Sequence, residues 1–167
     1  MYPFISDVSR NNKLKLILKH CSLRDSILEV GSGSSWLADK LRRQGFRVTT
    51  LDLAERADIV GDINQWEQLG LQRGTFDVVI ALEVIEHTDC LDALCDLCKR
   101  DGLIMLSSPH PRWDWVMKVL ESLGLNQKRT SPHNHLTDFR RIKMPYLLNT
   151  RPAFIHQVAI FINRRSG

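Results

Sequence analysis

Apolar runs with the character of strands alternate with amphipathic segments along the first two thirds of the chain. The clearest run spans residues 76–82, and its continuous β-branched residues are typical of a strand buried on both faces of a parallel sheet. A helix is predicted before the first strand, because Leu14, Ile17, Leu18 and Cys21 fall on one face at helical spacing. The predicted strands span residues 26–30, 46–51, 58–60, 76–82 and 103–107, and the predicted helices span residues 8–21, 35–44, 64–69, 83–87, 89–99 and 111–123.

The order of these elements predicts an α/β fold. Strands that alternate with helices at this spacing indicate a doubly wound, Rossmann-like sheet that is mostly parallel, with helices on both faces. Residues 147–151 and 153–163 predict two closing strands around a turn at Pro152, which form an antiparallel C-terminal hairpin. Residues 126–145 lack sustained periodicity and predict a long loop. The length of the chain fits one domain over residues 1–167.

A glycine turn after the first predicted strand marks the place where such a sheet binds ligands. Gly31 and Gly33 can adopt positive φ and leave no Cβ between the backbone and a ligand, while Ser34 or Ser35 can cap the next helix. Asp52 ends the second strand at an offset of about twenty residues, where an acid can accept both ribose hydroxyls. The spacing therefore favours a nucleoside ligand.

Composition and charge indicate the class of protein and where it is expected to act. Hydrophobic residues make up 43% of the chain and charged residues 25%, as in ordinary globular proteins. No apolar run is long enough to span a membrane, and the N-terminus lacks the pattern of a signal peptide, so we expect a cytoplasmic protein with no membrane partner. The net charge is +4, yet residues 126–167 hold 8 Lys and Arg against 1 Asp. This basic surplus is either a solvated surface or a means of steering an anionic molecule.

The four cysteines do not form a disulfide or zinc pattern. Cys90, Cys95 and Cys98 crowd one predicted helix, and Cys21 lies far from them in the sequence. Buried cysteine behaves as a small hydrophobic residue, and zinc requires a fourth ligand. We therefore expect these thiols to pack in the core and the protein to need no metal.

Four motifs in order resemble the class I S-adenosylmethionine-dependent methyltransferases, especially the small single-domain members of the methyltransferase type 11 kind. They are Leu28–Gly33, Leu51–Leu53, Gly61–Ile63 and the strand-four signature Phe76–His87. The resemblance implies S-adenosyl-L-methionine as the cofactor and a single class I methyltransferase-like domain over residues 1–167.

The resemblance also implies a role for each matched position. The loop from Glu29 to Ser34 would lie against the methionine part of the cofactor, Asp52 would bind the ribose hydroxyls, and Leu53 would pack on the adenine. Asp62 and Ile63 would meet the adenine edge, and Leu82 and Glu83 would line the pocket near the sulfonium. The implied cofactor-binding residues are Glu29, Gly31, Ser32, Gly33, Asp52, Leu53, Asp62, Ile63, Leu82 and Glu83.

Two positions distinguish this turn from related ones. Ser35 stands where the resembling family usually has a third glycine, and one alternative is a non-catalytic module that binds the cofactor or serves as a scaffold. Trp36 occupies the position where dinucleotide-binding turns need a glycine, and its bulk disfavours a nicotinamide-dependent reductase.

The sequence assigns no catalytic residue and no acceptor. His87 is either a general base or a structural histidine that shares a helical face with Glu83, and His133 and His135 either contact the acceptor or lie in a solvated loop. A small-molecule acceptor is favoured over RNA or protein, and an anionic one fits the steering interpretation of the basic residues. The short N-terminus leaves an acceptor pocket that is open or is completed by a partner chain.

Overall fold

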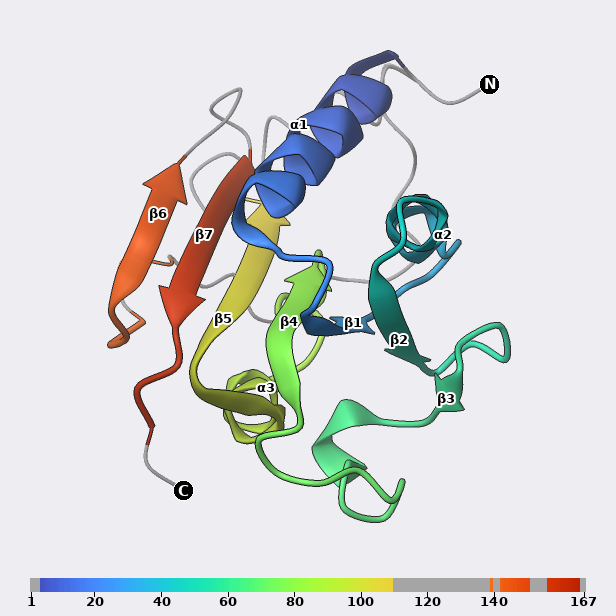
Figure 1. Ribbon diagram of the computed structural model, residues 1–167, viewed down its shortest axis with the longest axis vertical. Coiled ribbons are helices and arrows are strands. Elements are labelled where there is room, and N and C mark those ends of the chain that lie inside the picture. Colours follow the sequence, from blue (N-terminus) through green and yellow to red (C-terminus); the bar gives the residue numbers. More distant parts are fainter. Residues whose placement is uncertain (1–3, 110–138, 140–141, 151–155, 166–167) are drawn as a thin grey trace.

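A seven-stranded sheet with the order β3-β2-β1-β4-β5-β7-β6 forms the centre of the computed structural model, which describes residues 4–109, 139, 142–150 and 156–165 (Figure 1). The helices are α1 (Phe4–His20), α2 (Trp36–Arg43), the 3-10 helix η1 (Ile63–Gln65) and α3 (Leu91–Leu97). The strands are β1 (Ser26–Val30), β2 (Arg47–Asp52), β3 (Ile59–Val60), β4 (Phe76–Leu82), β5 (Cys98–Pro109), β6 (Tyr146–Thr150) and β7 (His156–Ile162).

Strand pairing confirms the predicted fold class. Strands β1 to β5 are parallel, and β7 pairs antiparallel with both β5 and β6. The strand order reverses at β1, which lies between β2 and β4, so the carboxyl ends of these three strands are neighbours. A crevice at that point is where an open α/β sheet binds its ligand.

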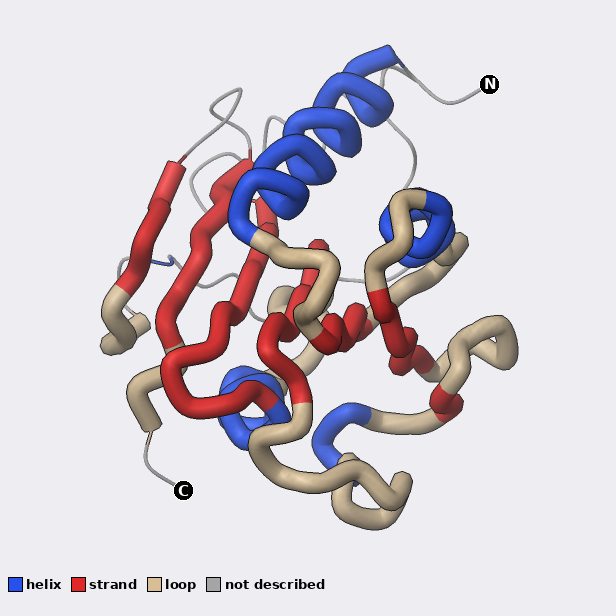
Figure 2. Tube along the Cα trace, in the orientation of Figure 1, coloured by secondary structure: helices blue, strands red, loops and turns tan. Residues whose placement is uncertain are grey.

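Two apolar clusters cover the two faces of the sheet. On one face, Leu14 and Ile17 of α1 and Leu37 and Leu41 of α2 pack on inward-facing residues such as Ile80 of β4. On the other face, the core contains residues of α3 and η1 together with Phe139 and Phe161, whose rings meet edge to face. Figure 2 shows how helices and strands alternate along the trace. The predicted placement of helices on both faces is confirmed.

Polar contacts close the end of the sheet where the parallel strands begin. The side chain of Asp77 accepts hydrogen bonds from the backbone N–H and the hydroxyl of Ser26 at 2.9 and 2.7 Å, and Lys99 donates to the same carboxylate at 2.7 Å. These contacts join the first residues of β1, β4 and β5. Burial opposes the change, but the hydrogen bonds from Lys99 and Ser26 lower the pKa of Asp77 to about 2.

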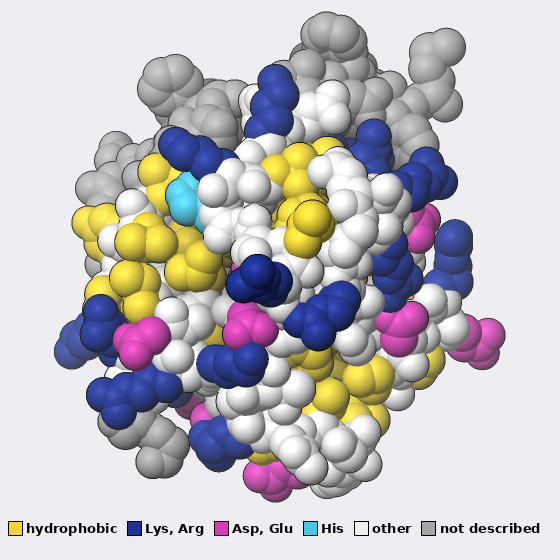
Figure 3. Space-filling view, viewed as in Figure 1, with side chains coloured by type: hydrophobic (Ala, Val, Ile, Leu, Met, Phe, Trp, Pro, Cys, Tyr) yellow, Lys and Arg dark blue, Asp and Glu magenta, His cyan; other side chains and the backbone are white. Residues whose placement is uncertain are grey.

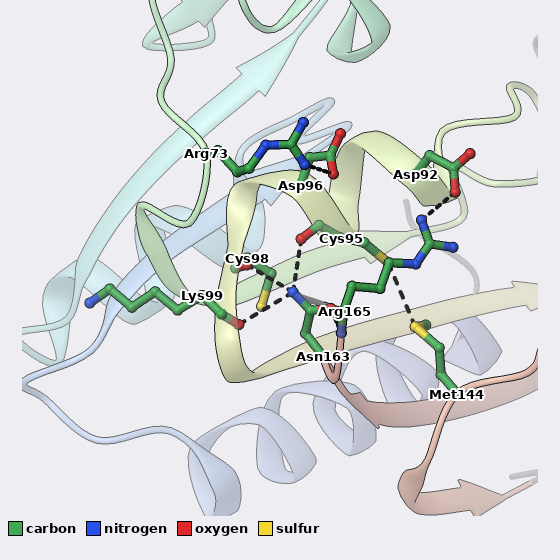
Figure 4. A network of polar contacts seen from close by, with 9 residues as sticks. All are labelled: Arg73, Asp92, Cys95, Asp96, Cys98, Lys99, Met144, Asn163 and Arg165. Atoms are coloured by element: carbon green, nitrogen blue, oxygen red, sulfur yellow. Dashed lines mark hydrogen bonds and ion pairs between the residues drawn. The ribbon is translucent and has the colours of Figure 1, made fainter. Parts of the chain in front are cut away.

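A second group of contacts fixes the C-terminal end of β7 at the same end of the sheet, where the parallel strands begin. The Asn163 amide donates to the backbone carbonyls of Cys95 and Cys98 at 2.8 Å each and to that of Lys99 at 3.3 Å (Figure 4). These carbonyls lie at the junction of α3 and β5, where a helix end leaves acceptors unsatisfied. Asn163 is 2% exposed and supplies the missing donors from a distant part of the chain.

The cysteine prediction is confirmed for the core. Cys90, Cys95 and Cys98 are 1%, 2% and 2% exposed and belong to one apolar cluster, with all four cysteines unpaired. Burial raises the pKa of the thiols of Cys90 and Cys98 to about 12, so they stay protonated at neutral pH. Over the part of the chain that the structure describes, no helix is long and apolar enough to cross a membrane.

Some local predictions were wrong. Residues 83–87 do not form a helix but a turn, because Glu83 has a φ of 58°, which a right-handed helix does not allow. The short helix after β3 is capped by Asp62 rather than Asn64, since the Asp62 carboxylate accepts the Asn64 N–H at 2.9 Å. Ser35 occupies the cap position of α2 but makes no side-chain cap hydrogen bond.

Other boundaries moved by a few residues. The first helix begins at Phe4 rather than at residue 8, and α3 is shorter than the predicted span of residues 89–99. The β6–β7 pair confirms the antiparallel C-terminal hairpin. The predicted helix over residues 111–123, the turn at Pro152 and most of the loop over residues 126–145 lie outside the described residues.

Candidate functional site

The glycine turn after β1 is held between β2 and the segment that follows β4. The Gly31 N–H donates to the Leu51 carbonyl at 2.8 Å, and Gly31 has a φ of 70°. A Cβ added at Gly31 would lie 2.4 Å from the Cγ2 atom of Val84. Both the backbone conformation and the close approach of Val84 therefore require glycine at this position.

Asp52 binds the same turn directly. Its carboxylate accepts the Gly33 N–H at 2.7 Å and the Ala54 N–H at 3.0 Å, and the side chain is half-buried at the end of β2. Each carboxylate oxygen can accept more than one hydrogen bond, so acceptor capacity is left for a ligand. The next residue, Leu53, is 75% exposed and presents an apolar side chain beside this carboxylate.

Glu29 is a buried acid of β1, close to the glycine turn. Burial raises the pKa of Glu29 to about 7, although the backbone N–H of Ala38 and the charge of Arg42 act in the opposite direction. Among the described residues, neither Oε2 of Glu29 nor Oγ of Ser32 has a hydrogen-bond partner.

The loop after β3 holds the next two predicted site residues, Asp62 and Ile63. Asp62 is exposed, whereas the Ile63 side chain is 4% exposed and packs in the core beneath it. The Asn64 amide donates to the hydroxyl of Thr88 at 3.3 Å, which joins this loop to the segment after β4. Asp62 directly follows Gly61, whose N–H donates to the Asp52 carbonyl at 2.9 Å, while the Ile63 side chain packs in the core.

The segment after β4 begins with Glu83, the first residue beyond the strand. The Glu83 N–H donates to the Ser107 carbonyl at 2.9 Å. The Glu83 carboxylate accepts the Ser107 hydroxyl at 2.6 Å and the Lys13 ammonium at 2.7 Å. Glu83 thereby joins the ends of β4 and β5 to helix α1.

A further acid, Glu86, is fully buried three residues later. Burial, followed by repulsion from Glu83, raises the pKa of Glu86 to about 8, while the nearby Ser108 hydroxyl and the charge of Lys13 act in the opposite direction. Glu86 is therefore mostly protonated at neutral pH, which leaves Glu83 as the charged partner of Lys13.

The sequence prediction did not include Lys13 and Glu86 among the site residues. For Lys13 the available signal was its position four residues before the buried Ile17, which puts a cation on the apolar face of a helix. For Glu86 the signal was an acid that directly follows the apolar pair Val84 and Ile85 in the strand-four motif. His87 does not share a helical face with Glu83, so that part of the prediction was wrong, and His133 and His135 lie outside the described residues.

The basic residues of the C-terminal segment are only partly described. Arg164 pairs with Asp101 at 3.2 Å, and Arg165 pairs with Asp92, as Figure 4 shows for the latter. Both pairs involve acids at or near α3 and the start of β5. On the face shown in Figure 3, Lys and Arg side chains are spread among acidic ones. Lys128, Arg129, Arg140, Arg141 and Arg151 lie outside the described residues.

The charges around the turn decide which ligands suit it. Glu29, Asp52, Asp62, Glu83 and Glu86 come from the ends of neighbouring strands. Such an arrangement disfavours a diphosphate and favours a ligand with cationic groups and hydroxyl donors. Within the described ranges, no group of three or more His, Cys, Asp or Glu side chains is placed to hold a metal ion.

Comparison with protein families gives a match over most of the chain. Residues 7–150 match the family model described as a methyltransferase domain. A ubiquinone biosynthesis O-methyltransferase from Albidiferax ferrireducens is 31% identical over 101 residues, which cover 49% of this chain and 40% of that protein. The chain thus spans about two fifths of the length of this relative.

Solved structures share the fold at low sequence identity. A protein from Pyrococcus horikoshii OT3 is similar with a TM-score of 0.64 and 17% identity, over 92% of this chain and 89% of that one. The magnesium protoporphyrin IX methyltransferase of Synechocystis PCC 6803, solved with bound S-adenosylhomocysteine, is similar with a TM-score of 0.63 and 16% identity, over 93% of this chain and 81% of that one.

Proposed function

The chain belongs to the methyltransferase domain family, and from this membership we propose that it transfers a methyl group from S-adenosylmethionine to a hydroxyl group of a small molecule. The observation that carries the proposal is the glycine turn itself. There, the Asp52 carboxylate accepts a hydrogen bond from the Gly33 N–H. The buried Oε2 of Glu29 and Oγ of Ser32 have no hydrogen-bond partner among the described residues. Buried polar atoms are rarely left without a partner, so these oxygens support a ligand with donors at this turn.

The residues present suit S-adenosylmethionine. This cofactor has an ammonium group, ribose hydroxyls and an adenine ring, and it has no phosphate. The carboxylates of Glu29 and Asp52 can accept from its donors, and the exposed Leu53 offers an apolar surface to a planar ring. The acids at the ends of β1, β2 and β4 tolerate a cationic sulfonium, whereas they would repel a phosphorylated cofactor.

Binding and orientation are the main tasks of the chain in this proposal. When bound, S-adenosylmethionine supplies a methyl group that its sulfonium already activates. The turn at Gly31 and Gly33 would fix one end of the cofactor, and Asp52 would fix the ribose. Leu82 and Glu83 would form the wall beside the reacting carbon and limit the access of water. Such positioning can supply a large part of the rate enhancement of a two-reactant reaction.

The proposed acceptor rests on the activity for which the relatives are named. Ubiquinone biosynthesis O-methyltransferases act on oxygen, and the chain shares 31% identity with one of them over 101 residues. A small molecule that carries a hydroxyl group is therefore the acceptor class that we propose. An anionic substituent on that molecule would fit the excess of Lys and Arg over residues 126–167.

A transfer assay tests this proposal. The protein is incubated with S-adenosylmethionine labelled on its methyl group and with a panel of small phenols and catechols, with and without carboxylate groups. We expect S-adenosylhomocysteine and a labelled methyl ether to form together, and matched acceptors whose hydroxyls are already methylated should give neither product. Cofactor binding without turnover on any acceptor would instead indicate the non-catalytic module, and the absence of both binding and turnover would contradict the whole proposal.

A further inference from the structure

One ion pair joins helix α1 to the wall of the proposed cofactor pocket. The Lys13 ammonium lies 2.7 Å from Oε1 of Glu83, although the two residues are 70 positions apart in the sequence. The Lys13 side chain is 10% exposed and the Glu83 side chain is 33% exposed, so solvent screens this pair less than a surface pair. The Lys13 ammonium is thus largely buried, where it pairs with Glu83.

Glu83 needs partners that hold it, because its backbone conformation is unfavourable. Its φ of 58° is in the left-handed region, which non-glycine residues seldom adopt. Such residues persist when the surrounding structure fixes them, and they cluster at functional sites. Here the Ser107 carbonyl binds the Glu83 N–H, while the Ser107 hydroxyl and the Lys13 ammonium bind its carboxylate.

Val84, the neighbour of Glu83, packs against the glycine turn, so the position of Glu83 affects the turn. Val84 follows Glu83 directly. Its Cγ2 atom packs so closely on Gly31 that a Cβ at that position would lie only 2.4 Å from it. Gly31 also belongs to the turn that binds Asp52 through Gly33. A displacement of Glu83 would therefore shift Val84 and open or crowd the turn, since a packed contact of this kind cannot absorb the change.

We propose that Lys13 is a positioning residue of the cofactor pocket: by holding the Glu83 carboxylate against Ser107, it keeps Val84 packed on the Gly31 turn. Helix α1 thereby sets the shape of the pocket from outside it. This inference rests on the proposed function, because the pocket is the one assigned above to S-adenosylmethionine. It assigns Lys13 an action through Glu83 and no contact with the reacting atoms.

The charge balance gives Lys13 a second reason to stay in place. Glu86 follows in the same turn as Glu83, and burial together with repulsion from Glu83 raises its pKa to about 8. Without the ammonium, the Glu83 carboxylate would lose its cationic partner in a partly buried site. A partly buried charge that loses its partner is costly. We therefore expect the turn to rearrange when the cation is removed.

The test measures affinity for S-adenosylhomocysteine by isothermal titration in a set of variants. Lys13→Met keeps the length and the apolar stem of the side chain but removes its charge, and Lys13→Arg keeps the charge. Lys15→Met is the matched control, because Lys15 is exposed on the same helix. We expect Lys13→Met to weaken binding about tenfold or more through misplacement of the pocket wall. Lys13→Arg should restore most of the affinity, and Lys15→Met should not change it.

A double-mutant cycle with Glu83→Gln separates positioning from general destabilisation. If Lys13 acts through Glu83, then Lys13→Met added to Glu83→Gln should cost little beyond the loss from Glu83→Gln alone. Should Lys13→Met fail to fold, Glu83→Gln tests the pair by removing the charge of the acid, and Lys13→Arg tests it by changing the cation while keeping its charge. Affinity that stays at the wild-type value in Lys13→Met or in Glu83→Gln overturns the inference, while wild-type protein that fails to bind S-adenosylhomocysteine overturns the proposed function instead.

Discussion

Acids at the two ends of the central sheet have pKa values that are shifted in opposite directions. At the end where the parallel strands begin, Asp77 is bonded to Ser26 and Lys99, and its pKa is lowered to about 2. At the end where they finish, burial raises the pKa of Glu29 to about 7 and that of Glu86 to about 8. Asp77 is therefore stable as an anion at neutral pH, whereas Glu29 and Glu86 hold their protons up to about neutral pH.

The difference extends to hydrogen bonds. At the first end, Asn163 satisfies three backbone carbonyls around the junction of α3 and β5. At the second end, Glu29 and Ser32 keep oxygens with no partner among the described residues, and Leu53 is 75% exposed. A polar network that is fully paired specifies and stabilises the fold, whereas one that is left partly unpaired is suited to a ligand. The two ends of the sheet therefore differ in how fully their polar groups are paired, and the end with unpaired oxygens is the one proposed to bind the cofactor.

Removal of the Asn163 side chain should give the largest change, and it should fall on stability alone. Asn163→Ala leaves the carbonyls of Cys95 and Cys98 buried without donors, which we expect to cost about 2 to 4 kcal/mol in the free energy of unfolding. Urea unfolding followed by circular dichroism measures this loss. Asn12→Ala, at an exposed position of α1, is the control. A loss below 1 kcal/mol would show that the junction does not depend on these bonds.

Replacement of Gly31 by alanine should damage the binding end instead. The new Cβ meets Val84 and must adopt a φ of 70°, so we expect affinity for S-adenosylhomocysteine to fall by about 1 to 3 kcal/mol. Gly70→Ala is the matched control, because Gly70 has a φ of 76° but open space around its Cβ position. Gly70→Ala should lower stability without changing affinity. Equal affinity in both variants would mean that Val84 yields without effect on the turn.

The pH dependence of stability should report Glu29. Its pKa is about 7 in the folded chain against an ordinary value of 4.5. Protonated Glu29 therefore favours the folded state fully below pH 4.5, and this stability is lost as the pH rises through 7. Glu29→Gln should reduce the loss of stability between pH 5 and pH 8 by roughly 1 to 2 kcal/mol relative to wild type. A pH profile of Glu29→Gln that coincides with that of the wild type would contradict the raised pKa.

The dominant strands could be predicted from the sequence because their signals are local. The β-branched run of β4 and the glycine at the end of α2 mark boundaries without help from distant residues. The segment over residues 83–87 could not be predicted in this way. Its helical pattern is overridden by contacts from Lys13 and Ser107, which lie 70 and 24 positions away in the sequence. Tertiary contacts of this kind leave no local signal.

The candidate site was predictable to the same extent. Gly31, Gly33 and Asp52 follow strand ends, and the parallel order of the sheet brings such residues together. The offset between them does not reveal that the Asp52 carboxylate accepts the Gly33 N–H directly. This bond depends on how the turn folds against the end of β2, which no spacing along the chain specifies.

The most direct measurement is a titration of S-adenosylhomocysteine into three proteins: the wild type, Asp52→Ala at the binding end and Asp77→Asn at the structural end. We expect the wild type to bind one equivalent and Asp52→Ala to bind about tenfold more weakly, since a charged acceptor for two hydroxyls is lost. Asp77→Asn should bind like the wild type despite a lower stability. Absent binding in the wild type, or equal affinity in Asp52→Ala, would contradict the assignment of the cofactor to this end of the sheet.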